Sequence, residues 1–63
     1  MADERVDEIC SALDSLIERL DDLALESLRA AVERGATTRP EIERRLVRAR
    51  HALERARHLL GGS

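Results

Sequence analysis

Two apolar stripes with heptad spacing, separated by a segment that starts at Gly35 and ends at Pro40, constrain the fold of this chain. Within each stripe, apolar residues recur at alternating intervals of three and four residues. This spacing aligns side chains along one face of an α-helix. We therefore predict an all-α chain with helices over residues 3–34 and 39–60. The stripes are Val6, Ile9, Leu13, Leu16, Leu20 and Leu23, then Ile42, Leu46, Ala49, Leu53, Ala56 and Leu60.

The segment between the stripes carries signals for a helix end and a helix start. Gly35 follows Arg34 directly after an apolar stripe, which is typical of a helix C-terminus. Thr38 and Glu41 have capping-box spacing, and Pro40 suits a first helical turn because its missing N–H has no partner there. The short loop predicts that the two helices are antiparallel neighbours, forming a hairpin.

Two interpretations of the first helix remain open beyond Leu23. The apolar residues that follow, Leu25, Leu28 and Val32, lie further round the helix. Either a stutter turns the apolar face, or the helix breaks at Asp21-Asp22, because Asp favours N-caps over helix interiors. We favour one continuous helix. The alternative is a three-helix chain with a break near residue 21.

The small size of the chain predicts self-association. Its 63 residues form one domain, 1–63, with a disordered tail at 61–63, and one cysteine excludes an internal disulfide. The first helix should extend about ten residues past the second, leaving Val6, Ile9 and Cys10 uncovered. Because two helices do not enclose a core, we expect a homodimer that forms a four-helix bundle, and count Leu28 with both stripes as its core and dimer interface. The alternative is a monomeric three-helix bundle.

Charge is divided between the two halves of the chain. Residues 1–35 hold four arginines and ten acids, a net charge of −6, and residues 36–63 hold seven arginines and three acids, a net charge of +4. Asp7, Asp14 and Asp21 repeat every seven residues along the first helix. Arg50 and Arg57 lie beside the second stripe, with Arg45 across it. We expect ion pairs between the helices that set their orientation.

A second group of arginines faces away from the second stripe. Arg44, Arg48 and Arg55, with His51 among them, form a candidate anion-binding ridge. Such a ridge is one way to bind phosphate or nucleic acid. The net charge of −2 and the lack of any aromatic residue for base stacking count against nucleic acid as the partner.

No arrangement of residues indicates catalysis, a cofactor or a metal site. His51 and His58 lie two helical turns apart, about 10.5 Å, too far to share one ion with Glu54. Cys10 has no base near it in sequence and is expected to be a small buried apolar residue. No apolar run has the length of a membrane span. We therefore expect a cytoplasmic, non-enzymatic protein.

The run Leu-Ala-Leu-Glu-Ser-Leu-Arg-Ala-Ala-Val-Glu-Arg-Gly that ends at Gly35, with the following Thr-Thr-Arg-Pro-Glu, resembles short uncharacterised helical-hairpin proteins of high-GC Gram-positive bacteria. The resemblance implies no activity and no functional residues. We predict a homodimeric association module that offers another protein a patch formed by Leu25, Leu28, Val32 and Leu59. The alternatives are a small nucleic-acid-associated or regulatory protein that uses the arginine ridge, and an antitoxin-like partner of another protein.

Overall fold

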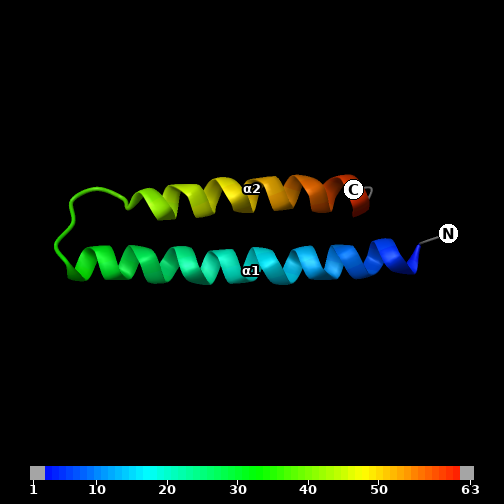
Figure 1. Ribbon diagram of the computed structural model, residues 1–63, viewed down its shortest axis with the longest axis horizontal. Helices are drawn as coiled ribbons and strands as arrows, with labels where there is room; N and C mark the ends of the chain where they lie inside the picture. The colour runs from blue at the N-terminus through cyan, green and yellow to red at the C-terminus, as the bar shows by residue number, and fades with distance from the viewer. Residues whose placement is uncertain (1–2, 62–63) are drawn as a thin grey trace.

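A computed structural model describes residues 3–61 as two helices, α1 (Glu4–Glu33) and α2 (Glu41–Gly61). They run antiparallel along their length and form a rod of 52 × 14 × 13 Å (Figure 1). All regular structure within residues 3–61 is helical, which confirms the predicted hairpin. The helix bounds differ from the predicted ones by one or two residues. Gly61 ends α2, and the rest of the predicted tail lies outside the described residues.

Helix α1 is continuous through Asp21 and Asp22, so the predicted break near residue 21 does not occur. Its N-terminus is capped by Asp3, whose carboxylate accepts a hydrogen bond from the backbone N–H of Arg5 at 2.9 Å. An Asp inside a helix is unfavourable when its side chain competes for backbone groups. Asp21 avoids this competition because its carboxylate faces Arg50 of α2.

The turn after α1 has the geometry that the glycine predicted. Gly35 has φ +76°, and its N–H donates to the Val32 carbonyl while the Ala36 N–H donates to the Ala31 carbonyl. This pair of bonds is a Schellman motif, which needs the left-handed backbone that glycine adopts freely.

The start of α2 differs from the prediction. The helix begins at Glu41, and the Pro40 carbonyl accepts from the backbone N–H of Arg44 at 3.3 Å, so Pro40 occupies the N-cap position. Thr38 therefore lies two residues too early to cap the helix. The predicted capping box with Glu41 is wrong: neither side chain takes part in the side-chain hydrogen bonds found within residues 3–61.

The helices face one another along lines that differ slightly from the predicted stripes. The best-shielded positions of α1 are Val6, Cys10, Leu13, Ile17, Leu20, Ala24, Leu28 and Ala31, and those of α2 include Glu43, Leu46, Arg50, Leu53 and Arg57. Both sets keep heptad spacing, but each is turned part of the way round from its predicted stripe. A single neighbouring helix covers only one side of a broad apolar face, and α2 turns its arginines towards the acids of α1.

The register of the hairpin follows from the ion pairs of Arg57 with Asp14 and Arg50 with Asp21. Counting along both helices from these pairs places Gly61 level with Cys10, and Glu41 level with Ala30. The part of α1 that extends past the end of α2 is therefore residues 4–9, about 9 Å long. This overhang is shorter than predicted, and Cys10 lies beneath α2, because the loop end of α1 also extends beyond the start of α2 (Figure 1).

Candidate interaction surface

One face of the hairpin is held together by ion pairs between the helices. Arg57 Nε donates to Asp14 Oδ1 at 3.0 Å, and Arg50 Nε lies 2.6 Å from Asp21 Oδ1 without hydrogen-bond alignment. Arg50 also donates from Nη1 to Glu54 Oε1 at 2.7 Å. The predicted interhelical pairing is confirmed for these two arginines. The hydrogen bond and charge of Asp14 raise the pKa of Arg57.

The opposite face is apolar. In a right-handed helix, the residue directly before each shielded position lies on one side of the line of contact, and the residue directly after it lies on the other side. In an antiparallel pair, the residues that precede shielded positions lie on the same side of the hairpin in both helices. Asp14 and Asp21 each follow a shielded position. The other side carries large exposed side chains, most of which directly precede a shielded position. They are Ile9, Leu16, Leu23, Ile42 and Leu60. We call these five residues, with Ala49, the apolar face.

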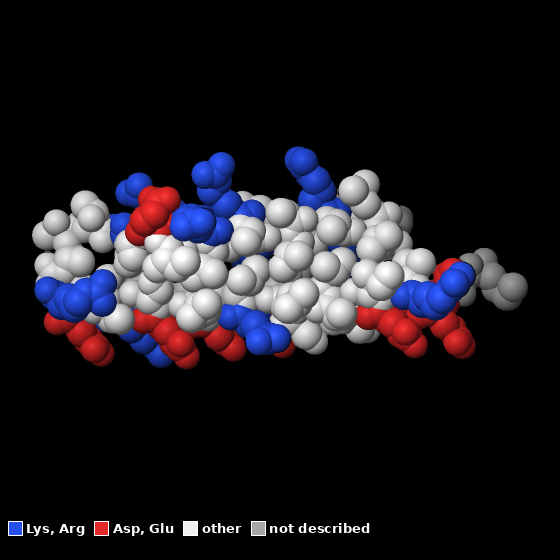
Figure 2. All heavy atoms as spheres, viewed as in Figure 1, with Lys and Arg blue, Asp and Glu red and all other residues white. Residues whose placement is uncertain are grey.

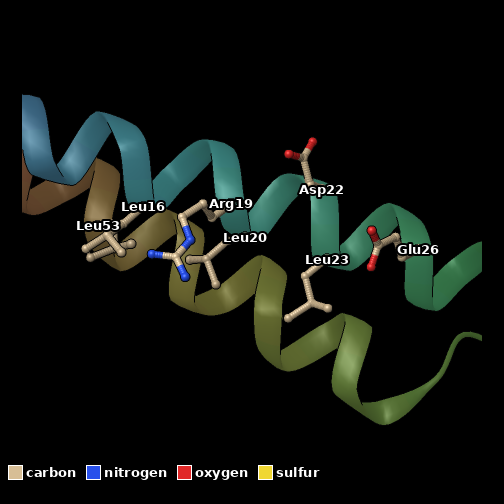
Figure 3. Close-up of a pocket in the computed structure, with 7 residues that line it drawn as sticks. All are labelled: Leu16, Arg19, Leu20, Asp22, Leu23, Glu26 and Leu53. Atoms are coloured by element: carbon tan, nitrogen blue, oxygen red, sulfur yellow. The ribbon is translucent and has the colours of Figure 1, made fainter.

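A groove runs along this face between the helices. It has a volume of about 470 Å³ and is lined by leucines of both helices with charged residues at its rim. Figure 3 shows Leu20 and Leu23 extending from α1 towards α2, while Asp22 points away. The Arg19 guanidinium lies between Leu53 and Leu20 in this view. The groove has an apolar floor and a polar edge, the usual layout of a surface that receives another helix.

The charge distribution on the surface agrees with this division. In the view of Figure 2, a mostly uncharged strip follows the line between the helices. Acidic side chains, with arginines among them, lie along the outer edge of α1, and the charged side chains along the outer edge of α2 are mainly arginines. On the side of the hairpin seen in Figure 2, the strip between the two helices is therefore mostly uncharged.

The structure divides the predicted core and dimer interface into shielded and exposed residues. The exposed residues form the apolar face, and three of them come from each stripe. Leu46 is buried, Val6, Leu13, Leu20, Leu28, Leu53 and Ala56 are half-buried, and Ile9, Leu16, Leu23, Ile42, Ala49 and Leu60 are exposed. The sequence placed Arg50 and Arg57 beside the second stripe, but it did not indicate that Glu43 lies between the helices.

The predicted partner patch does not form a single surface. Leu25 and Val32 are exposed on α1, and Leu28 between them is half-buried. Leu59 is exposed on α2, but in the register of the hairpin it lies level with Ala12, about 20 Å along the rod from Leu25. Leu59 instead borders the apolar face.

The predicted arginine ridge is exposed along α2. Arg44, Arg48 and Arg55 make none of the ion pairs found within residues 3–61. Arg48, His51, Ala52 and Arg55 line a shallow open depression. Its walls all come from one helix, and it has no buried polar group aimed into it.

Glu54 and Cys10, which the sequence analysis considered for metal binding and catalysis, both pack within the hairpin or pair with a neighbouring residue. Glu54, which the sequence places between two histidines, accepts a hydrogen bond from Arg50. Cys10 is buried, as predicted. Within residues 3–61, no three metal-binding side chains lie close enough together to hold an ion.

Glu43 is the one buried charged residue within residues 3–61, and the sequence pattern did not single it out. Its side chain is 7% exposed, and Oε1 lies 3.4 Å from Nη1 of the exposed Arg39. Its other oxygen, Oε2, is buried without a hydrogen-bond partner. Burial of a half-satisfied carboxylate is costly. The position of Glu43 between the helices therefore carries a desolvation cost, which the contact with Arg39 offsets in part.

No family model matches this chain, and no curated protein or solved structure is significantly similar to it. The resemblance to helical-hairpin proteins of high-GC bacteria therefore stays a prediction. Neither helix of the described part contains an apolar stretch of the length and purity that a bilayer crossing requires.

Proposed function

We propose that this protein is a non-enzymatic association module whose apolar face binds a second copy of the chain to form a four-helix bundle. The observation that carries the proposal is the groove between Leu16, Leu23 and Leu53, which has leucine walls and lies open along the hairpin. Apolar side chains in such a groove gain free energy when another helix removes them from water.

The isolated hairpin has a very small core. Within residues 3–61, the buried apolar residues are Cys10, Ala31 and Leu46, and no large side chain is fully enclosed. Eight large apolar side chains are exposed, and five of these belong to the apolar face. A chain of this size with so little buried surface needs a further source of stability. Covering the apolar face supplies it without a disulfide or a metal.

The shape of the groove supports a pair of helices as the occupant. Leu16, Leu20 and Leu23 line it from α1, and Leu53 lines it from α2, so the groove extends along the helix direction and suits another helix pair. A two-fold dimer uses the same patch on both copies, so one apolar face explains the whole interface. The proposal places the protein in the cytoplasm, which agrees with its lone free thiol at Cys10.

The molar mass in solution tests the proposal. In sedimentation equilibrium the natural chain should have twice the 7.1 kDa mass of one copy, with dissociation only on dilution. Circular dichroism on the same sample should show a strongly helical chain. A helical chain that keeps the mass of a single copy at about 100 µM, where even a weak complex is largely assembled, would refute the dimer.

A further inference from the structure

We propose that the two copies pack with both loops at the same end of the bundle, so that α1 of each copy lies against α2 of the other. This inference rests on the proposed function, because it specifies the arrangement of the dimer. The alternative two-fold dimer has its loops at opposite ends, with α1 against α1 and α2 against α2. Both arrangements keep all neighbouring helices antiparallel.

Side-chain size along the apolar face favours the same-end arrangement. The register of the hairpin places Leu16 level with Ala56, Leu23 with Ala49, and Ala30 with Ile42, each within one residue. At every one of these levels, one helix has a large side chain and the other has an alanine.

A two-fold axis parallel to the helices keeps these levels unchanged. Leu23 then packs against the partner's Ala49, and Leu16 against the partner's Ala56. Each contact combines a large residue with a small one, so all four helix pairs keep a similar spacing.

The opposite-end arrangement gives uneven contacts. It places Ile9, Leu16 and Leu23 of α1 against their own copies, and it places the α2 row of Ile42, Ala49, Ala56 and Leu60 against its own copy. Helix spacing depends on the side chains between the helices. The α1 pair would have large side chains at all three levels, whereas the α2 pair would have only alanines at Ala49 and Ala56, so the spacing of the two helix pairs would differ there.

Charge at the rim of the groove agrees with the same-end arrangement. Glu26 lines the rim, and in the hairpin register it lies level with Arg45. Both side chains are exposed, and neither belongs to the ion pairs found within residues 3–61. In the same-end dimer Glu26 faces the partner's Arg45 twice, once on each side. In an opposite-end dimer in which Leu16 lies against its own copy, Glu26 faces the partner's Arg5 instead.

Cysteine cross-linking distinguishes the two arrangements. All variants carry Cys10→Ala, so that the natural thiol does not react. Chains with Leu23→Cys are mixed with chains with Ala49→Cys, and oxidised glutathione is added to form disulfides. A non-reducing gel then measures the amount of covalent dimer. The mixture should cross-link strongly, whereas each variant alone should not. Leu16→Cys alone should also stay unlinked, because it meets an alanine of the partner.

Cross-linking of Leu16→Cys alone, or a mixture that links no better than its components, would overturn the same-end arrangement. Sedimentation of the same variants before oxidation keeps the two proposals apart. Dimers with the wrong cross-links overturn only the arrangement, and helical single copies overturn the proposed function.

A charge exchange tests the rim contact independently. Glu26→Arg should weaken dimerisation about tenfold, because it places like charges together at two equivalent contacts. Adding Arg45→Glu should restore it. Adding Arg5→Glu is the matched control and should not. Rescue by Arg5→Glu rather than by Arg45→Glu would indicate the opposite-end dimer.

Discussion

Arg57 of α2 and Asp14 of α1, 43 positions apart in sequence, are joined by a hydrogen bond of 3.0 Å from Nε to Oδ1. Together with the ion pair of Arg50 and Asp21, which lies seven residues away on each helix in the direction of the loop, this bond fixes the axial register of the hairpin. Both pairs lie on the face opposite to the groove. The molecule therefore uses its charge to align the two helices and leaves its apolar side chains for association.

Asp14→Asn should lower the melting temperature slightly, and the loss should shrink in about 1 M salt, where charges are screened within about 3 Å. Arg57 keeps its charge throughout the accessible pH range, because the pKa of an arginine is high and that of Arg57 is raised further. Salt concentration is therefore the variable that tests the charge interaction from the side of Arg57. The exchange of Asp14→Arg with Arg57→Asp should recover most of the loss. A loss that is independent of salt would mean that Asp14 acts through packing instead of charge.

Leu23→Glu should abolish dimerisation, leaving a helical single copy at about 10 µM, because two carboxylates would be buried in the interface. Leu25→Glu is the matched control: Leu23 is 48% exposed and Leu25 is 46% exposed, yet Leu25 does not line the groove. Sedimentation equilibrium measures both. If the two variants weaken the dimer equally, the groove is not the interface.

Glu43→Leu should raise the free energy of unfolding by about 1 kcal/mol, because it removes a buried carboxylate that has one unpaired oxygen. Glu41→Leu is the control, since Glu41 is exposed in the same first turn and also loses its favourable interaction with the helix dipole. Urea unfolding measures both. A stability loss in Glu43→Leu would show that the bond to Arg39 outweighs the burial.

Gly35→Ala should lower the free energy of unfolding by about 1 kcal/mol, because alanine tolerates the left-handed backbone poorly. No atom lies within 4 Å of the position of an added Cβ, so the cost is conformational and not steric. Gly35→Asn, which adopts this backbone more readily, should cost less. Equal losses for alanine and asparagine would point to a cause other than the backbone angle.

Asp3→Ala should destabilise the chain near neutral pH and much less at about pH 2. The hydrogen bond from the Arg5 N–H lowers the pKa of Asp3 below its ordinary value of 3.8. A carboxyl whose pKa is lowered by folding stabilises the fold above its unfolded pKa, and this contribution disappears as pH falls through the folded pKa. Thermal melts of both proteins across this acid range measure the difference. A difference that persists undiminished in acid would exclude the carboxylate as the source.

The sequence predicted the hairpin because its signals were local. Heptad spacing, the glycine after Arg34 and the proline before Glu41 each act within a few residues. The continuity of α1 at Asp21 depended on a contact with Arg50, which is far away in sequence, so both interpretations had to stay open. Likewise, the capping box was a local pattern displaced by Pro40, which took the N-cap position itself.

The division of the apolar residues was harder to predict. Helical periodicity shows which residues share a broad face, but not which side of that face the neighbouring helix covers. That choice depended on Arg50 and Arg57 turning towards Asp21 and Asp14. As a result, each predicted stripe is divided between the line where α1 meets α2 and the face that opens on the groove.

The register set by Arg57 and Asp14 also has a consequence for the order in which the chain folds. Contacts beside the turn at Gly35 close short loops, whereas the bond between Arg57 and Asp14 joins residues 43 positions apart. Because the entropy cost of closing a loop rises with its length, pairing of the helices is cheapest next to the turn and most expensive at the free ends. The helices should therefore pair first next to Gly35 and last at the free ends. Amide hydrogens near the free ends should exchange with solvent first.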